Sequence, residues 1–339
     1  MLYLTNSAFN AGGLRWFPRL ATALLAVGVT TLSALNCNAE TFPGKPIRIV
    51  NTVSAGGPAE LIARIVGQKF TETWGQQVVV DSRPGASGII GVEIAAHAAP
   101  DGYTLLLGSS MTMALAPQLR RTIPYDPFKD FVPVGMIVVS PFVLVAHPSL
   151  GARTVSEFVA LAKAKPGFYN FGSLGAGSSA HLGGEQLKTR AGINILHIAY
   201  KGAAPAATAL AAGEVHVLFN SAGSALPHVK AGRLVLLATG GTKRSPLSPD
   251  TPTVAETYPG FEVVSSYGLV APAKTPREIV LKLNSEIGRA LANQDIVDRL
   301  VAQGHEPRPG TPEDMRAYMQ QEYAKWGKVI KDAGVKADE

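Results

Sequence analysis

The sequence is poor in the groups on which much protein chemistry depends. Its one cysteine, Cys37, lies near the N-terminus, while aromatic residues make up 7% and charged residues 17% of the chain. Without the segment that contains Cys37, the chain can form no disulfide and has no thiol for catalysis or for binding a metal ion. The composition therefore argues against a disulfide-rich, thiol-dependent or zinc-thiolate protein.

Dense clusters of basic residues are also absent, although the formal net charge is +6. Lysine and arginine are spread along the chain, whereas nucleic-acid-binding proteins concentrate them in a patch or stripe. No segment repeats at a fixed period, and none is of low complexity. We therefore expect no nucleic-acid partner and no repeat architecture.

One apolar run, Leu20–Leu35, is long enough to suggest export or a membrane anchor. Arg15 and Arg19 precede it, and small residues end at Ala39, as in a signal peptide. The run is shorter than a membrane span requires. We therefore predict that residues 1–39 are a signal peptide, cleaved after about Ala39, and that the processed chain is periplasmic.

Apolar segments that suit strands alternate with segments of helical periodicity, a pattern typical of α/β proteins with mostly parallel sheets covered by helices. The predicted strands, besides the one that begins at Ile47, are 78–81, 103–108, 132–139, 142–146, 195–199, 215–220, 235–239 and 267–271. The predicted helices are 59–74, 88–98, 155–165, 180–190, 203–212, 276–292 and 312–333. In such folds, ligands bind beyond the carboxyl ends of the strands.

The strand that begins at Ile47 leads through Gly56 and Gly57 into a helix whose first residue is Pro58. Backbone N–H groups at a helix start have no acceptor within the helix, and the glycines leave them unhindered. Such a helix end attracts anions. We therefore predict that residues 53–57 form part of a cradle for a small anion.

Other predicted strand ends carry similar loops, rich in glycine and in residues with a hydroxyl group. They are residues 83–88, 108–112, 172–179, 200–202 and 220–224. One such loop is ordinary, since serine often caps helices. Several together predict two walls that hold a small carboxylate through hydrogen bonds, and Ser110 of the second loop is included among the candidate ligand residues.

Enzymatic interpretations are weaker. His181 and Glu185 are four residues apart on a predicted helix, but without a second nearby histidine they make a poor zinc site, and a capping or supporting role fits better. The GxSxG motif of serine hydrolases and the phosphate-binding glycine motifs are absent. We expect no enzymatic activity, no cofactor and no metal.

Several segments then establish a resemblance. They are Phe42–Val50 followed by Ala55–Gly57, Arg83–Gly88, Asp101–Leu106, Ser173–His181 with Leu182 and Glu185, Tyr200–Ala206, and Pro252–Glu256. In this order they resemble the extracytoplasmic solute receptors of the tripartite tricarboxylate transporter class, often called the Bug family. The resemblance spans nearly the whole chain after residue 40.

The resemblance implies a two-lobed periplasmic-binding-protein fold, similar to type 2. Lobe 1 would comprise residues 40–140 and 265–339, and lobe 2 residues 141–264. The chain would capture a dicarboxylate, an acidic amino acid or an aromatic acid for membrane subunits of such a transporter, and we expect a monomer. The ligand loops of the family would fall on Val53, Ala55, Gly56, Gly57, Ser87, Gly88, Ser173, Gly175, Ser178, Lys201, Gly202, Asn220 and Ser221.

Two questions stay open. Glu60 stands where these receptors often have an aspartate that can face the ammonium group of an amino acid, and its longer side chain puts that role in question. Lys201 fits a charge on the ligand and a solvated loop residue equally well. The alternative function is a sensor, in which a membrane signalling protein recognises the liganded receptor.

Overall fold

Strands that lead into helices pair in parallel, as the alternating sequence pattern predicts. The structure is a computed structural model, and it describes residues 42–335. The predicted signal peptide lies outside these residues. All elements named below belong to one structural unit that begins at Lys45.

One section of the sheet has the strand order β2-β1-β3-β9-β4, and β10 pairs with β4. The other section joins β4 to β7, β5 and β6 in that order, and β8 also pairs with β4. The strands are β1 (Ile47–Asn51), β2 (Val78–Ser82), β3 (Thr104–Ser109), β4 (Phe131–Ala146), β5 (Asn170–Ser173), β6 (Leu196–Ala199), β7 (Val217–Ser221), β8 (Val235–Thr239), β9 (Val264–Pro272) and β10 (Glu306–Pro307).

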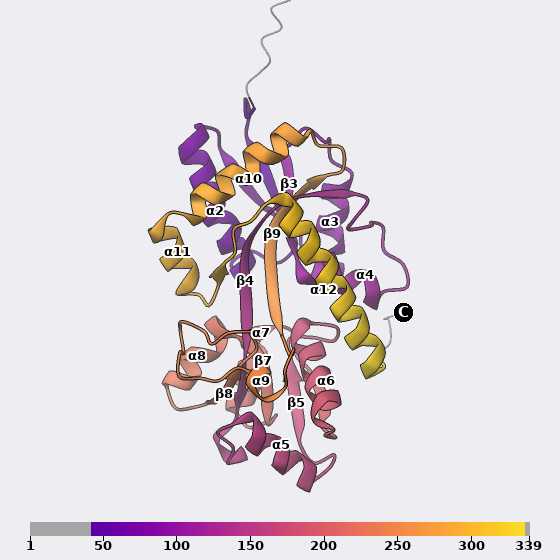
Figure 1. Cartoon of the computed structure of the whole chain (residues 1–339), viewed down its shortest axis with the longest axis vertical. Helices are drawn as coiled ribbons and strands as arrows, with labels where there is room; N and C mark the ends of the chain where they lie inside the picture. Colours follow the sequence, from indigo (N-terminus) through magenta and orange to yellow (C-terminus); the bar gives the residue numbers. More distant parts are fainter. Residues whose placement is uncertain (1–41, 336–339) are drawn as a thin grey trace, which may run out of the picture. The chain divides into compact units, whose positions relative to one another are not determined.

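The long strand β4 joins the two sections, and Figure 1 shows it running beside β9. Its residues up to Pro141 pair with β9, and those from Phe142 pair with β7 and β8. The predicted break between residues 139 and 142 is therefore wrong, because one strand changes partners there instead. Around this point Phe142 N–H donates to Val263 O at 3.1 Å, and Gly240 N–H donates to Phe142 O at 2.7 Å.

The α/β two-lobed fold is confirmed, but the sheet is mixed. Pairings of β1 with β2 and β3, and of β5 with β6 and β7, are parallel. Every antiparallel pairing among residues 42–335 involves β4 or β9. The prediction of mostly parallel sheets therefore holds for the strand–helix units and fails for the two strands that run along the junction.

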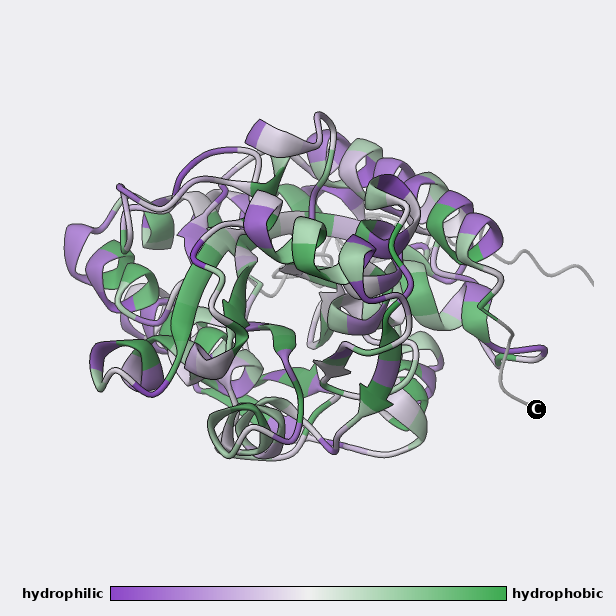
Figure 2. Ribbon diagram, turned by 90° about the horizontal axis from the view of Figure 1, so that it is seen from below, coloured by the Kyte–Doolittle hydropathy of each residue, from purple (hydrophilic) through white to green (hydrophobic). Residues whose placement is uncertain are grey.

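Helices flank the sheet, and Figure 2 shows hydrophobic strands between helices that alternate hydrophobic and hydrophilic along their length. They are α2 (Pro58–Trp74), α3 (Ile89–Ala96), α4 (Ala116–Leu119), α5 (Val155–Ala164), α6 (Ser179–Ala191), α7 (Ala203–Ala211), α8 (Ala222–Lys230), α9 (Val254–Thr257), α10 (Arg277–Leu291), α11 (Gln294–Val301) and α12 (Pro312–Ala333). Short helical turns occur at η2 (Ala86–Gly88), η3 (Met111–Leu115) and η4 (Pro148–Leu150).

Local signals explain why the longest helices agree with their predicted ranges. In α12, Thr311 and Asp314 form a capping box, and Gly334 ends the helix with φ 64°. In α2, Pro58 is the first residue, and Gly75 ends the helix with φ 66°. Strands β5 and β10 and helices α4, α8, α9 and α11 were not predicted.

One hydrophobic cluster joins segments that are far apart in the sequence. Leu115 and Leu119, from the segment after β3, form one buried cluster with Leu182 of α6 and Trp326 of α12. Helices α12 and α6 thereby pack on each other. Between residues 42 and 335, no helix combines the length and apolar composition that a membrane crossing requires.

Candidate functional site

The predicted cradle lies at the start of α2, and a side chain of the helix itself occupies part of it. Gly56 has φ 86°, and Gly57, the N-cap residue, receives no side-chain cap. The Gly56 N–H instead donates to the carboxylate of Glu60, which also accepts a 2.8 Å hydrogen bond from Arg64 Nε. The pKa of Glu60 is lowered by the Gly56 N–H and then by Arg64.

This arrangement answers the question about Glu60. Its carboxylate is buried, with 6% of the residue exposed, and it is neutralised by Arg64 on the next turn. Its charge is therefore not free to meet an ammonium group. Beside it lies a cavity of about 330 Å³, to which the loop after α11 contributes Gln303. Sequence reasoning missed Gln303, because no local pattern links it to α2.

The loop with Ser87 and Gly88 packs directly against the cradle. Gly88 has φ 93°, and a Cβ atom there would lie 2.9 Å from Thr112 Cγ2 and 3.1 Å from Thr52 Cβ. Only glycine allows the two loops to approach so closely. Ser87 is exposed, and its hydroxyl accepts a 3.0 Å hydrogen bond from Arg120 Nη2.

Ser110 is buried, as Ser173 and Asn220 are. It is 2% exposed, and its hydroxyl lies 2.8 Å from the Ser266 hydroxyl and accepts from Ser266 N–H at 2.9 Å. These bonds tie the end of β3 to β9. The hydroxyl of Ser110 is therefore used by the fold.

The loop from Ser173 to Ser178 uses its hydroxyls in the same way. Ser173 donates to Gly175 O at 3.0 Å, and Ser178 donates to the same oxygen at 2.7 Å. Ser178 also caps α6 by accepting from His181 N–H. The serines thus shape the loop, so a ligand here would meet mainly backbone groups.

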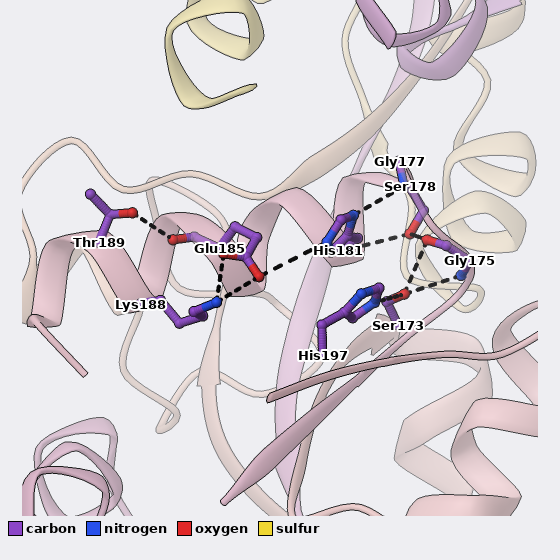
Figure 3. Close-up of polar contacts among 9 residues, drawn as sticks. All are labelled: Ser173, Gly175, Gly177, Ser178, His181, Glu185, Lys188, Thr189 and His197. Carbon is purple, nitrogen blue, oxygen red and sulfur yellow. Dashed lines mark hydrogen bonds and ion pairs between the residues drawn. The ribbon is translucent and has the colours of Figure 1, made fainter. Parts of the chain in front are cut away.

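Two stacked histidines support this loop, as Figure 3 shows. The rings of His181 and His197 lie 3.8 Å apart between centroids, with 16° between their planes. His181 Nδ1 accepts from Gly177 N–H at 3.0 Å, and His197 Nε2 lies 2.7 Å from Ser173 Oγ. The capping role expected for His181 is confirmed by its bond to Gly177 N–H. The contact of His197 with Ser173 was not predicted.

The polar chain in Figure 3 continues along α6. Because Nδ1 of His181 accepts a hydrogen bond, the neutral ring carries its proton on Nε2, which lies 3.9 Å from Glu185 Oε1. Glu185 is in turn paired with Lys188 at 2.8 Å. Burial, and then the neighbouring His181, lowers the pKa of His197 to about 4. His197 is therefore neutral at neutral pH.

The two remaining loops of lobe 2 lie beside the first. Tyr200 N–H donates to Ser173 O at 3.0 Å, and Asn220 Nδ2 donates to Ala203 O at 3.1 Å. Asn220 is fully buried, whereas Lys201 is exposed and forms no ion pair with any residue between 42 and 335. The parallel strands β5, β6 and β7 thus bring their carboxyl ends together.

Helix starts divide into two groups. Side chains cap α5, α6, α11 and α12. No side chain caps α2, α3, α7 or α8, whose N-cap residues are Gly57, Gly88, Gly202 and Ser221. All four belong to the predicted ligand set, although α4 and α10, outside that set, are also uncapped. The N–H groups in the first turns of α7 and α8 remain available for an anion, whereas Pro58 at the start of α2 has no N–H and the Ile89 N–H at the start of α3 donates to Ala86 O.

The structure therefore gathers the predicted residues into two groups. Thr52, just before the cradle, meets Gly88, and residues 173–178, 200–203 and 220–221 meet at the carboxyl ends of β5, β6 and β7. Leu119 packs on Gly177, since a Cβ there would lie 2.9 Å from Leu119 Cδ1. Gly304 packs on Ala222 in the same way. Within residues 42–335, no group of three acidic, histidine or cysteine residues is placed to hold a metal ion.

These features define a two-lobed protein of the kind that binds solutes. Comparison with known proteins gives the family: residues 62–335 match the tripartite tricarboxylate transporter family receptor. The chain belongs to this family. The BugT protein of Bordetella pertussis is 35% identical over 317 residues, which cover 93% of this chain and 97% of BugT.

Solved structures agree in both sequence and fold. Rpa4515 of R. palustris, whose structure contains adipate, is 35% identical, with a TM-score of 0.78 over 86% of this chain and 98% of its own. MatC of Rhodopseudomonas palustris, with bound malate, is 31% identical, with a TM-score of 0.73 over 85% of this chain and 100% of its own. The resemblance found in the sequence is thereby confirmed.

Proposed function

We propose that this receptor binds a small dicarboxylate between its lobes in the periplasm and delivers it to the membrane subunits of a tripartite tricarboxylate-type transporter. The observation that carries the proposal is the grouping of four helix starts without side-chain caps at the predicted ligand loops. Backbone N–H groups at helix starts bind carboxylates without a dedicated cation. Adipate in Rpa4515 and malate in MatC support this ligand class.

The pairing of Glu60 favours a dicarboxylate over an acidic amino acid. An amino acid presents an ammonium group, which needs an acceptor that carries a free charge. Glu60 instead accepts from Gly56 N–H and is neutralised by Arg64. The candidate position for recognising an ammonium group is therefore already engaged.

Closure of the two lobes on the ligand is the proposed mechanism, with no chemical step and no cofactor. The ligand would stabilise the closed form because it contacts both walls only there. We place the boundary at residues 140–141 and 264–265. The change of partner along β4 between Pro141 and Phe142, next to the Val263 contact, supports this placement.

Thermal unfolding of the processed chain, purified from the periplasm of a bacterial host and refolded to remove bound ligand, tests the proposal. The panel contains dicarboxylates, tricarboxylates, acidic amino acids and aromatic acids. A ligand at about a hundred times its dissociation constant adds roughly 2.7 kcal/mol to the free energy of unfolding. A response confined to dicarboxylates is expected, and no response from any carboxylate would refute the proposal.

Two matched variants test the cradle itself. Gly56 and Gly75 both have positive φ, and a Cβ at either position would meet no atom within 4 Å. Valine at either position therefore costs similar backbone strain, about 1–2 kcal/mol. Gly56→Val should abolish binding, whereas Gly75→Val, at the other end of α2, should leave affinity unchanged. Equal affinities in the two variants would exclude the cradle as a ligand site.

A further inference from the structure

Arg120 lies where the two groups of predicted ligand loops approach each other. It follows α4, and its Nη2 donates to Ser87 Oγ at 3.0 Å in the lobe 1 wall. Its neighbour Leu119 packs directly on Gly177, in the loop of lobe 2. One residue and its neighbour thus touch both walls, although Ser87 is 33 positions away in the sequence.

The charge of Arg120 is not balanced by any acidic residue between positions 42 and 335. Several arginines of the fold have carboxylate partners, among them Arg48 with Asp81 and Arg64 with Glu60, whereas Arg190 and Arg308, like Arg120, have none between residues 42 and 335. Arg120 has the single side-chain hydrogen bond to Ser87. A guanidinium has five N–H donors in a planar fork that suits a carboxylate, so most of its donors remain available.

We propose that Arg120 binds the second carboxylate of a dicarboxylate whose first carboxylate occupies the uncapped helix starts. This inference rests on the proposed function and adds to it the basis of selectivity. A bidentate contact to a guanidinium is stronger and more directional than neutral hydrogen bonds. Arg120 thereby selects dicarboxylates over monocarboxylates of the same length.

The position of Arg120 also makes this contact sensitive to closure. Ser87, which holds the guanidinium, is exposed and has φ 58°, and Leu119, the residue before Arg120, packs on Gly177 of the other lobe. When the lobes close, water is displaced around the guanidinium, and its interaction with a carboxylate strengthens. The second carboxylate therefore favours the closed form.

Isothermal titration of the processed, refolded chain with matched acids tests the role of Arg120. The panel pairs each linear dicarboxylate of four to eight carbons with the monocarboxylate of equal length, such as adipate with hexanoate. Arg120→Gln should weaken dicarboxylate binding by roughly 10- to 100-fold and leave monocarboxylate binding unchanged. Arg120→Lys should restore part of the loss, since it keeps the charge but not the fork.

Arg121→Gln is the control, because it removes the same charge one position along the chain. It should leave both affinities unchanged, and circular dichroism and the unfolding midpoint report whether each variant is folded. If Arg120→Gln keeps the ratio of dicarboxylate to monocarboxylate affinity, or weakens both equally, the role of Arg120 is refuted. A wild-type chain that binds no carboxylate would refute the proposed function as well, so the two failures are distinguishable.

Discussion

The stacked histidines under the loop of lobe 2 permit a sharp test, in which two amides replace the same ring. Asparagine at position 181 can place its Oδ1 near the position of Nδ1, and so can still accept from Gly177 N–H. Glutamine extends its amide toward the position of Nε2 and leaves that N–H without its acceptor. His181→Asn should therefore retain ligand binding better than His181→Gln.

The size of the difference follows from the hydrogen bond that Gly177 N–H donates to His181 Nδ1 at 3.0 Å. This bond is buried, because His181 is only 8% exposed. A buried donor left without an acceptor costs about 1–3 kcal/mol. If the loop must hold its shape to bind, this corresponds to a weakening of roughly 5- to 150-fold in dissociation constant. Both variants also lose the ring stack with His197, worth about 0.5–1.5 kcal/mol.

The assay measures the dissociation constant of the best dicarboxylate and the free energy of unfolding for both variants. His197 supplies the converse pair: His197→Gln keeps a polar atom near Nε2 for Ser173, and His197→Asn does not. The favoured amide should therefore differ between the two positions. Equal affinities for asparagine and glutamine at both positions would show that ring volume alone matters and would refute this reasoning.

Three further predictions concern other parts of the fold. Glu60→Gln should tighten dicarboxylate binding a few-fold in titration calorimetry, because the positive charge of Arg64 is then no longer balanced while Gly56 N–H keeps an acceptor; unchanged or weaker binding would contradict this. Burial lowers the pKa of His197 and His305 from 6.5 to about 4, so the unfolded chain takes up protons first, and denaturant titrations should show stability falling as the pH drops from about 6.5 to about 4; constant stability across that interval would count against it. Gly184→Ala should destabilise the protein by about 1–3 kcal/mol in urea, because its Cβ would lie 2.1 Å from Phe171, whereas Gly288→Ala, with no atom within 4 Å, should be neutral or stabilising; similar effects for the two would refute the packing argument.

Elements with local signals could be predicted from the sequence. The Thr311 cap and Gly334 define α12, and Pro58 and Gly75 define α2. The continuity of β4 could not be predicted, because Pro141 interrupts its pattern. Its place in the sheet depends on β7, β8 and β9, which are distant in sequence.

The positions of the candidate-site loops could be predicted from the sequence, but the contacts of their side chains could not. Their glycines and serines mark them in the sequence, and parallel strands bring them to one edge. Whether a hydroxyl faces a ligand or the loop depends on partners elsewhere: Ser173 bonds to His197, 24 residues away, and Ser110 bonds to Ser266, 156 residues away. Arg120 was missed for the same reason, because its contact with Ser87 spans 33 residues of sequence.

The place of β9 between β3 and β4 has a consequence for the order in which the chain can fold. Strands β5, β6, β7 and β8 pair with one another or with β4, so these pairings are complete once residues 131–239 exist. By contrast, β3 and β4 cannot join until residues 264–272 are made, because β9 is the strand that connects them. Such contacts between distant residues form slowly. The chain therefore stays incompletely folded until residues 264–272 have been synthesised.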